Sequence, residues 1–162
     1  NHNDTVKYVG KEQCRMCHAE IYDSYIETGM GKSFHFATKE HSDLMDSEMP
    51  IIHDSIKNLS YKPFWKNDSL YLKEFRLNGK DTIHMLVKKV DYKIGSGHHT
   101  NSHLFEINGY VHQMPYTYYT QKEIADLPPG FEAGQNTRFS REIALECMSC
   151  HNAYPNYDNK IL

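Results

Sequence analysis

The sequence lacks a long hydrophobic stretch and an extended run of basic residues. No segment approaches the about 18 consecutive apolar residues that build a membrane-spanning helix, so no transmembrane segment is expected. The 18 Lys and Arg residues are outnumbered by 21 Asp and Glu, and the longest purely basic run is Lys88-Lys89. A surface that follows the phosphates of a nucleic acid is therefore not expected either.

Apolar residues are also scarce. When Gly is counted in place of Tyr, about 37% of the 162 residues are apolar, against about 45–50% in typical globular domains. The 24% charged and 12% aromatic residues nevertheless exclude a disordered polymer. The length predicts a single domain over residues 1–162, with a thin core that bound cofactors would complete.

Histidine and cysteine carry the strongest signal in the chain. The 11 His outnumber the 9 Gly, which favours metal or haem chemistry. All four Cys fall in two copies of one pattern, Cys14 to His18 (CRMCH) and Cys147 to His151 (CMSCH). This C-x-x-C-H pattern is typical of covalent haem c attachment.

The spacing within each motif suits that chemistry. Two thiols three positions apart lie on one face of a helical turn, where both can bond to the vinyl groups of one porphyrin. The adjacent imidazole can then bind the iron from the same side. The motifs thus predict two haem c groups. The expected haem-attaching residues are Cys14, Cys17, Cys147 and Cys150, and the expected proximal iron ligands are His18 and His151.

The four Cys have three other possible uses. A structural zinc site would usually place its two Cys pairs about 15–20 residues apart, whereas about 130 residues separate these pairs. A thioredoxin-like redox pair requires a βαβ context that the sequence does not show. Zinc also does not require a His immediately after each pair. Structural disulfides are the third alternative. Covalent haem is the preferred interpretation.

Hydrophobic periodicity predicts a helix at each haem motif. Residues 10–29 are expected to form one helix that begins at the first motif and ends at Gly29. Residues 140–150 are expected to form another, with Ser140 as N-cap and with Ile143, Leu145 and Cys147 facing inward. The second motif would form the C-terminal end of this helix.

The middle of the chain changes to a strand-like pattern. Residues 69–75 and 82–90 flank Asn78-Gly79, and residues 103–107 and 110–119 flank Asn108-Gly109, so two antiparallel hairpins are expected. Residues 38–68 and 127–137 are expected to be long surface loops. The predicted fold class is α+β, with haem-bearing helices near both ends around two haems and with hairpins and long loops between them.

Several segments together resemble a known family. Their sequences are YVG at 8–10, CRMCH at 14–18, TGMGKSF at 28–34, IGSGHHTNS at 94–102, Met114-Pro115 and ECMSCHNAYP at 146–155. They resemble the N-terminal module of bacterial multihaem c-type cytochromes, some of which carry tetratricopeptide repeats downstream. The resemblance covers residues 8–155 and leaves open whether the chain is a complete dihaem protein or part of a longer one.

Each iron needs a sixth, distal ligand in addition to its proximal His. By the resemblance, His99 is the expected distal ligand, with His98 beside it as an alternative. Met30 is a candidate because relatives often place a ligand about a dozen residues after the motif His, and His35 is a further candidate. The remaining His residues are expected to be structural or exposed.

The resemblance implies an electron carrier, located in the periplasm, on the cell surface or outside the cell. Haem c is attached outside the cytoplasmic membrane, so export is expected, with the sequence beginning after a cleaved leader. The expected partners are redox proteins. Two alternatives stay open: a small-molecule reductase or peroxidase that uses a haem with an open coordination position, and a self-associating subunit of a haem-lined filament.

Overall fold

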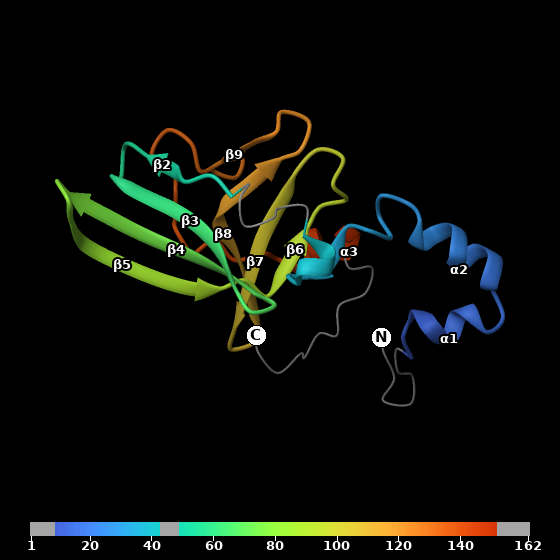
Figure 1. Cartoon of the computed structure of the whole chain (residues 1–162). Helices are drawn as coiled ribbons and strands as arrows, with labels where there is room; N and C mark the ends of the chain where they lie inside the picture. Colours follow the sequence, from blue (N-terminus) through green and yellow to red (C-terminus); the bar gives the residue numbers. More distant parts are fainter. Residues whose placement is uncertain (1–8, 43–48, 152–162) are drawn as a thin grey trace.

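A computed structural model describes residues 9–42 and 49–151 of the chain. Two antiparallel sheets dominate it (Figure 1). The five-stranded sheet has the order β1-β6-β7-β8-β9, and the four-stranded sheet has the order β2-β3-β4-β5. The five strands are β1 (Phe34–Phe36), β6 (Tyr92–Ile94), β7 (Asn101–Ile107), β8 (Tyr110–Tyr119) and β9 (Ile124–Asp126). The four strands are β2 (Ile52–Asp54), β3 (Leu59–Lys66), β4 (Ser69–Asn78) and β5 (Asp81–Lys89).

Both predicted hairpins are confirmed. β4 pairs with β5 around Gly79, which has a φ of 59°, and β7 pairs with β8 around Asn108 and Gly109, which have φ values of 54° and 83°. Positive φ at these positions is what a tight two-residue hairpin turn requires, and Asn and Gly tolerate it best. The turn residues therefore set the pairing of β4 with β5 and of β7 with β8.

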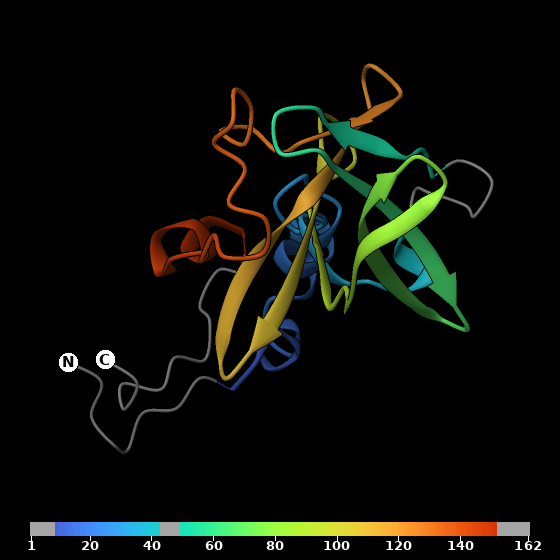
Figure 2. The same ribbon diagram turned by 90° about the vertical axis from the view of Figure 1, so that its left-hand side faces the viewer.

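The core lies between the two sheets, whose relative orientation is clearest in Figure 2. Tyr61 and Leu72 of the four-stranded sheet belong to the same buried cluster as Phe105, Met114 and Tyr116 of the five-stranded sheet. Met114, Tyr116 and Tyr61 are each at most 1% exposed. Burial of this apolar area by strands supplies the main hydrophobic stabilisation.

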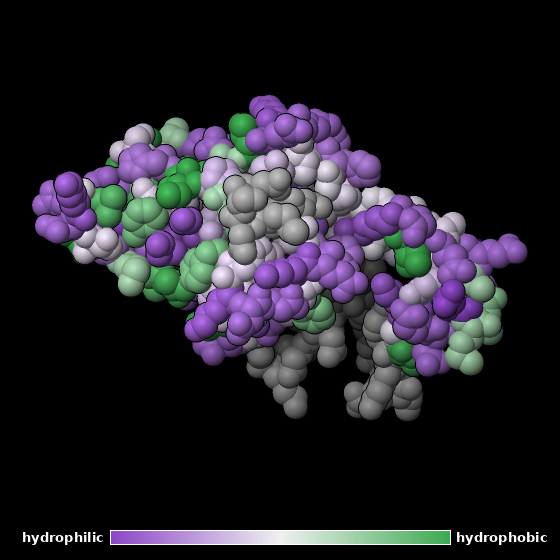
Figure 3. All heavy atoms as spheres, in the orientation of Figure 1, coloured by the Kyte–Doolittle hydropathy of each residue, from purple (hydrophilic) through white to green (hydrophobic). Residues whose placement is uncertain are grey.

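Part of the scarce apolar content lies at the surface instead. β5 is an edge strand, and Ile83, Met85 and Val87 on it are 59%, 64% and 43% exposed. Figure 3 shows hydrophobic side chains gathered over β4 and β5. The core is consequently even thinner than the composition suggested.

The prediction of one continuous helix over residues 10–29 is wrong. The structure has α1 (Lys11–Arg15) and α2 (Ala19–Ile26), separated at His18, whose φ of −126° and ψ of 44° leave the helical region. The two helices lie against each other and project beyond the sheets (Figure 1). Neither contains a buried residue, so the apolar periodicity on which the helix was predicted does not correspond to a face packed into the core.

The second predicted helix is shorter than expected. Helix α3 spans Leu145–His151, whereas Glu142 forms an isolated bridge with His112 and the Ile143 N–H donates to the Val111 carbonyl. Pairing with β8 therefore replaces the first predicted helical turn. Ile143 is half-buried, but Leu145 and Cys147 are exposed, so the expected inward face is wrong as well.

The α+β fold class, with haem-bearing helices around two haems, is contradicted. The described residues form nine strands in two antiparallel sheets and only three short α-helices, so the protein is mainly β. The expected loop at 38–68 is also wrong in part because it contains β2 and β3. Pro63 lies in β3 beyond the residues that pair with β2, and there β3 pairs with β4 alone. Its missing N–H therefore removes no hydrogen bond to β2.

Candidate functional site

The first haem motif lies at the junction of α1 and α2. Cys14 belongs to α1, Cys17 follows in the connecting turn, and His18 precedes α2. The N–H groups of Cys17 and His18 both donate to the Cys14 carbonyl, at 3.3 and 2.9 Å. One turn of backbone therefore separates the two thiols, and all three side chains are exposed.

Polar contacts hold this helix pair together. The Tyr22 hydroxyl donates to the Glu12 carboxylate at 2.5 Å, and the Arg15 Nε donates to the Asp23 carboxylate at 3.0 Å. The Arg15 guanidinium also lies 5.4 Å from the centre of the Tyr22 ring. Each of these exposed contacts contributes little stability. Together they join α1 to α2, the two helices between which the first motif lies.

The second motif lies wholly within α3. Cys147, Cys150 and His151 are exposed on it, whereas Met148 is only 7% exposed and anchors the helix to the body of the protein. The Ser33 hydroxyl lies 3.2 Å from the His151 carbonyl oxygen, to which it can donate. The end of α3 is thus joined to the segment between α2 and β1.

Two of the segments that carry distal-ligand candidates meet near this contact. The Ser33 hydroxyl also lies 2.8 Å from the Met30 carbonyl oxygen, and the Gly95 N–H donates to the Ser33 carbonyl at 2.7 Å. The Met30 side chain is 57% exposed. The backbone of Met30 and the start of the loop that carries His98 therefore lie close to the second motif.

The other candidates are held differently. His98 and His99 are exposed, and the Thr120 N–H donates to the His99 carbonyl at 3.0 Å, which fixes their loop to the end of β8. His35 lies in β1, where its ring stacks on that of His41 with a centroid distance of 4.5 Å. His41 is one of the His residues expected to be structural or exposed; it is exposed, and the sequence did not predict its contact with His35.

Burial, followed by the neighbouring His41 and the more distant Lys93 and Lys11, lowers the pKa of His35. A hydrogen bond to the Lys32 backbone opposes this shift without reversing it. His35 is therefore held in its neutral form to lower pH than an exposed imidazole.

The donor sets of both motifs suit a haem c group. Each offers two exposed thiols separated by one helical turn and an exposed imidazole on the next residue. Across residues 9–42 and 49–151, no three His, Cys, Asp and Glu side chains converge in a way that could hold a metal ion. The four thiols thus do not gather around one centre, as a structural zinc site would require.

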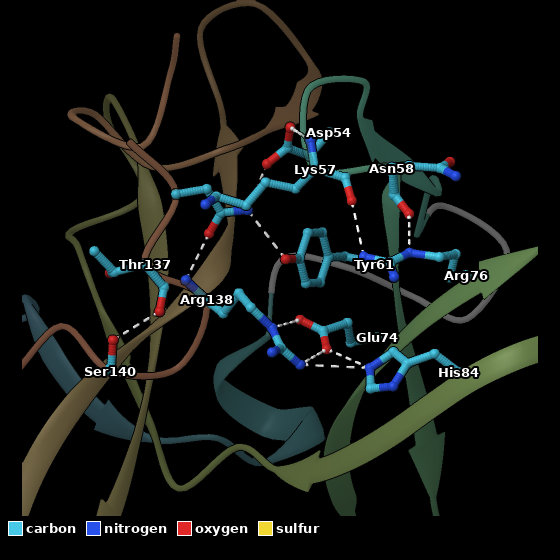
Figure 4. A network of polar contacts seen from close by, with 11 residues as sticks. Asp54, Lys57, Asn58, Tyr61, Glu74, Arg76, His84, Thr137, Arg138 and Ser140 are labelled. Carbon is cyan, nitrogen blue, oxygen red and sulfur yellow. Dashed lines mark hydrogen bonds and ion pairs between the residues drawn. The ribbon is translucent and has the colours of Figure 1, made fainter. Parts of the chain in front are cut away.

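A buried ionic network, which the sequence reading missed, secures the segment that leads to α3 (Figure 4). Glu74 of β4 is 0% exposed, and its carboxylate accepts hydrogen bonds from Arg138 through both Nε, at 3.0 Å, and Nη2. The His84 Nε2 lies 2.7 Å from the same carboxylate. Arg138, which lies seven positions before the start of α3, is thereby held on the four-stranded sheet.

A second set of contacts holds the same segment two residues earlier. The Asn136 amide donates to the Asp54 carboxylate at 2.8 Å and to the Tyr61 hydroxyl at 3.0 Å. Asn136 is 2% exposed and Asp54 is 4% exposed. Burial raises the pKa of Tyr61, so its hydroxyl stays protonated and available as a donor.

The carboxylate of Glu74 makes stability depend on pH. Burial alone would raise its pKa, but hydrogen bonds from Arg138 and His84 and the Arg138 charge outweigh burial and lower it. Because the folded pKa is lower than the unfolded one, this stabilisation is present above the unfolded pKa of about 4.3 and is lost as pH falls through the folded value. We expect chemical denaturation to show a steep loss of stability below about pH 4.5.

The matched variants are Glu74→Gln and Glu20→Gln, the second at an exposed position in α2. Glu74→Gln should weaken the protein at pH 7 and flatten the acid dependence, whereas Glu20→Gln should leave the acid dependence as it is. An unchanged acid slope in Glu74→Gln would contradict the assignment to this carboxylate.

One sequence signal could have revealed the network. Leu70, Leu72 and Glu74 occupy alternating positions of β4, and all three point into the protein. A charged residue in the inward register of a strand requires buried partners. The identity of those partners, which lie 10 and 64 residues away, is not encoded in local periodicity.

Comparison with known proteins adds no identification. No protein-family model, no curated protein and no solved structure matches this chain at a significant level. The geometry of the two motifs is therefore the basis on which a function is proposed.

Proposed function

We propose that this protein is an electron-transfer protein that carries two covalently attached haem c groups. The observation that supports the proposal is the presence of two C-x-x-C-H motifs that use all four Cys and present their thiols and imidazoles at the surface. A bound haem supplies one-electron iron chemistry. The resemblance to bacterial multihaem cytochromes supports the same interpretation.

The residues of each motif have distinct roles in this proposal. Cys14 and Cys17 hold one haem, and His18 supplies its proximal nitrogen. Cys147 and Cys150 hold the other, with His151 as proximal ligand. His99 remains the leading distal candidate, with Met30, His35 and His98 as alternatives.

The two sites differ in their attachment to the body of the protein. The first lies on a helix pair with no buried residue, whereas the second lies on a helix anchored by Met148 and joined to Ser33. In this proposal, the firmly held second site exchanges electrons with the first, which is more accessible to a partner protein. Partners with basic surfaces would be favoured because the chain carries a formal charge of −3 before haem propionates are counted.

The proposal includes export, because haem is attached to such motifs outside the cytoplasmic membrane. Among residues 9–42 and 49–151, no helix has the length and apolar character needed to cross a bilayer. The periplasm, the cell surface and the extracellular space remain the proposed locations.

The test is haem stoichiometry after expression with an export leader in a host that attaches haem c. The chain should carry two haems that survive denaturation and acid–acetone extraction, measured by pyridine haemochrome absorbance and mass spectrometry. The double variant Cys14→Ser/Cys17→Ser and the double variant Cys147→Ser/Cys150→Ser should each carry one. His53→Ala, at an exposed His outside both motifs, is the control and should retain two. A chain that carries no covalent haem, or that binds zinc instead, would overturn the proposal.

Spin state separates a carrier from a reductase or peroxidase. For a carrier, both irons are expected to be low-spin and six-coordinate in the oxidised and reduced forms, as seen by absorption and electron paramagnetic resonance spectra. A high-spin iron with a vacant position in both redox states would contradict electron transfer as the sole role.

A further inference from the structure

The outer face of the four-stranded sheet is not used by either haem motif. Figure 1 shows this sheet at the opposite end of the molecule from α1 and α2. Its inward positions include Tyr61, Leu72 and Glu74, which are buried. Because successive residues of a strand point to opposite faces, the alternate positions form the outer face. That face includes Lys62, Phe64 and Lys66 of β3, Tyr71, Lys73 and Phe75 of β4, and Met85, Val87 and Lys89 of β5.

The charges on this outer face are all positive, although the whole chain has a formal charge of −3. Lys62 lies directly opposite Lys73 in the ladder of β3 and β4, where like charges repel each other. No outward position of β3, β4 or residues 84–89 is an Asp or Glu. Lys89 pairs with Asp91 at 3.5 Å, whereas Lys62, Lys66 and Lys73 form no ion pair within the described part of the chain. A partner with carboxylates would relieve this repulsion.

Apolar side chains lie among these lysines. Phe64 stacks on Tyr71 with a ring-centre distance of 5.5 Å, and Phe75 lies directly opposite Met85. Met85 and Val87 are both exposed. An exposed apolar centre bordered by polar and charged side chains is typical of a protein interface.

The edge of this sheet is open at β5. Among residues 9–42 and 49–151, β4 is the only strand that pairs with β5. The Val90 N–H donates to the Leu70 carbonyl at 2.9 Å. Because bonded and non-bonded positions alternate along an antiparallel ladder, the N–H and C=O groups of Met85 and Val87 point away from β4. A bulge at Ile83, where the register shifts, limits the open edge to the residues that follow.

These outward backbone groups distinguish between kinds of partner. A lipid surface would meet the lysines but would leave the N–H and C=O groups of Met85 and Val87 without partners, which is costly in an apolar medium. A nucleic acid would meet the lysines but could not continue the ladder. An extended protein segment can do both, by pairing its backbone with β5 and placing carboxylates over the outer face.

We propose that β5 and the outer face bind an extended acidic segment of a partner protein, which joins the four-stranded sheet as a further strand beside β5. Neighbouring strands lie about 4.8 Å apart, so the added strand lies about 10 Å from β4, within the combined reach of a Lys and a Glu side chain. Lys73 is therefore the main charge partner, and Lys62 contributes from farther away. This site does not depend on the proposed haem chemistry.

The probe is a fluorescein-labelled peptide of about ten residues in which Val and Glu alternate. Fluorescence anisotropy with the full chain should show saturable binding. A matched peptide that alternates Val and Lys should bind at least about tenfold more weakly, because its charges repel the outer face. Lys73→Glu should weaken binding of the Glu peptide more than Lys62→Glu does. Lys122→Glu, at an exposed turn outside this sheet, should leave it unchanged.

Two changes test whether the peptide binds as a strand. Val87→Pro removes an N–H that points away from β4, so it should weaken binding at least about tenfold, whereas Val87→Ala keeps the N–H and should weaken it less. Far-ultraviolet circular dichroism verifies that each variant is folded. In the peptide, the Glu residues opposite Met85 and Val87 direct their N–H groups to β5. N-methylation of the Glu amides should therefore abolish binding, and N-methylation of the Val amides should not, a comparison that needs no variant of the protein.

Three results would overturn the proposal: equal binding of the Glu and Lys peptides, equal effects of the two N-methylations, or no binding of the Glu peptide. Two further results would replace the acidic segment with another occupant. One is binding to phosphatidylglycerol vesicles without binding to the peptide, which would indicate a membrane surface. The other is a dimer in sedimentation velocity that Val87→Pro dissociates and excess peptide does not, which would indicate a second copy of this chain.

Discussion

Arg138→Ala should destabilise the protein by about 2–3 kcal/mol at pH 7. The substitution removes both guanidinium hydrogen bonds from Glu74, which is 0% exposed, and leaves a buried carboxylate next to the His84 imidazole. Removing one partner of a fully buried pair costs about 3–5 kcal/mol. A smaller effect is expected here because the Arg138 side chain is 43% exposed. Urea denaturation monitored by far-ultraviolet circular dichroism measures it.

Arg15→Ala provides the matched control. It removes the same side chain from an ion pair in which Arg15 and Asp23 are 54% and 51% exposed, where a pair contributes about 0–1 kcal/mol. The double variant Glu74→Leu/Arg138→Met should recover part of the lost stability, since it removes the buried charge together with its partner. Equal effects of Arg138→Ala and Arg15→Ala would contradict the role given to the network.

Phe131→Ala should have a comparable or larger effect, about 3–5 kcal/mol. Phe131 is 0% exposed although it lies in the loop between β9 and α3, and the Arg141 guanidinium stacks over its ring at 4.1 Å. The substitution leaves a cavity and removes that contact. Thermal unfolding of the purified chain measures the loss.

The control for this prediction is Phe36→Ala, the same change at a side chain that is 69% exposed. It should cost less than about 1 kcal/mol, although it also removes the contact with Tyr92. If the two Phe variants had equal stability, the loop between β9 and α3 would not be packed as described.

Both substitutions act on the segment that connects the sheets to the second haem motif. Arg138, Asn136 and Phe131 anchor this loop at three successive places before α3 begins. In the proposed function, that anchoring keeps Cys147 to His151 in a fixed position relative to the sheets. Covalent haem content should therefore be measured in Arg138→Ala together with its stability. The comparison shows whether loss of this anchor also reduces haem attachment.

The hairpins could be predicted because their information is local. Asn108-Gly109 adopts the positive φ values that a two-residue turn demands, and the strands on either side alternate in the pattern of a half-buried sheet. The same holds for β4 and β5 around Gly79. The turn residues and the alternating pattern of the strands indicate the same structure. The two hairpins can therefore be predicted without knowledge of any distant contact.

The helices could not be predicted to the same degree, because their extent depends on competing contacts. The Tyr22, Tyr25 and Ile26 pattern is that of an amphipathic helix, yet α2 buries none of its residues. The stretch from Ser140 to Ala144 has helical character in isolation, but β8 offers its backbone a strand partner. Periodicity records which residues are apolar and not which surface they meet.

Sequence alone determined the positions of the two C-x-x-C-H motifs, on which the proposed haem chemistry rests, and the two central hairpins. These features depend on residue identity and on spacings of at most a few positions. Only the tertiary structure decided that the core lies between two sheets and that Glu74 meets Arg138 across 64 residues. It also decided that the segment of Met30 adjoins the second motif through Ser33. Those contacts depend on the chain topology. Burial of apolar area stabilises a contact whatever the separation of its residues in the sequence, so local patterns do not reveal which residues meet.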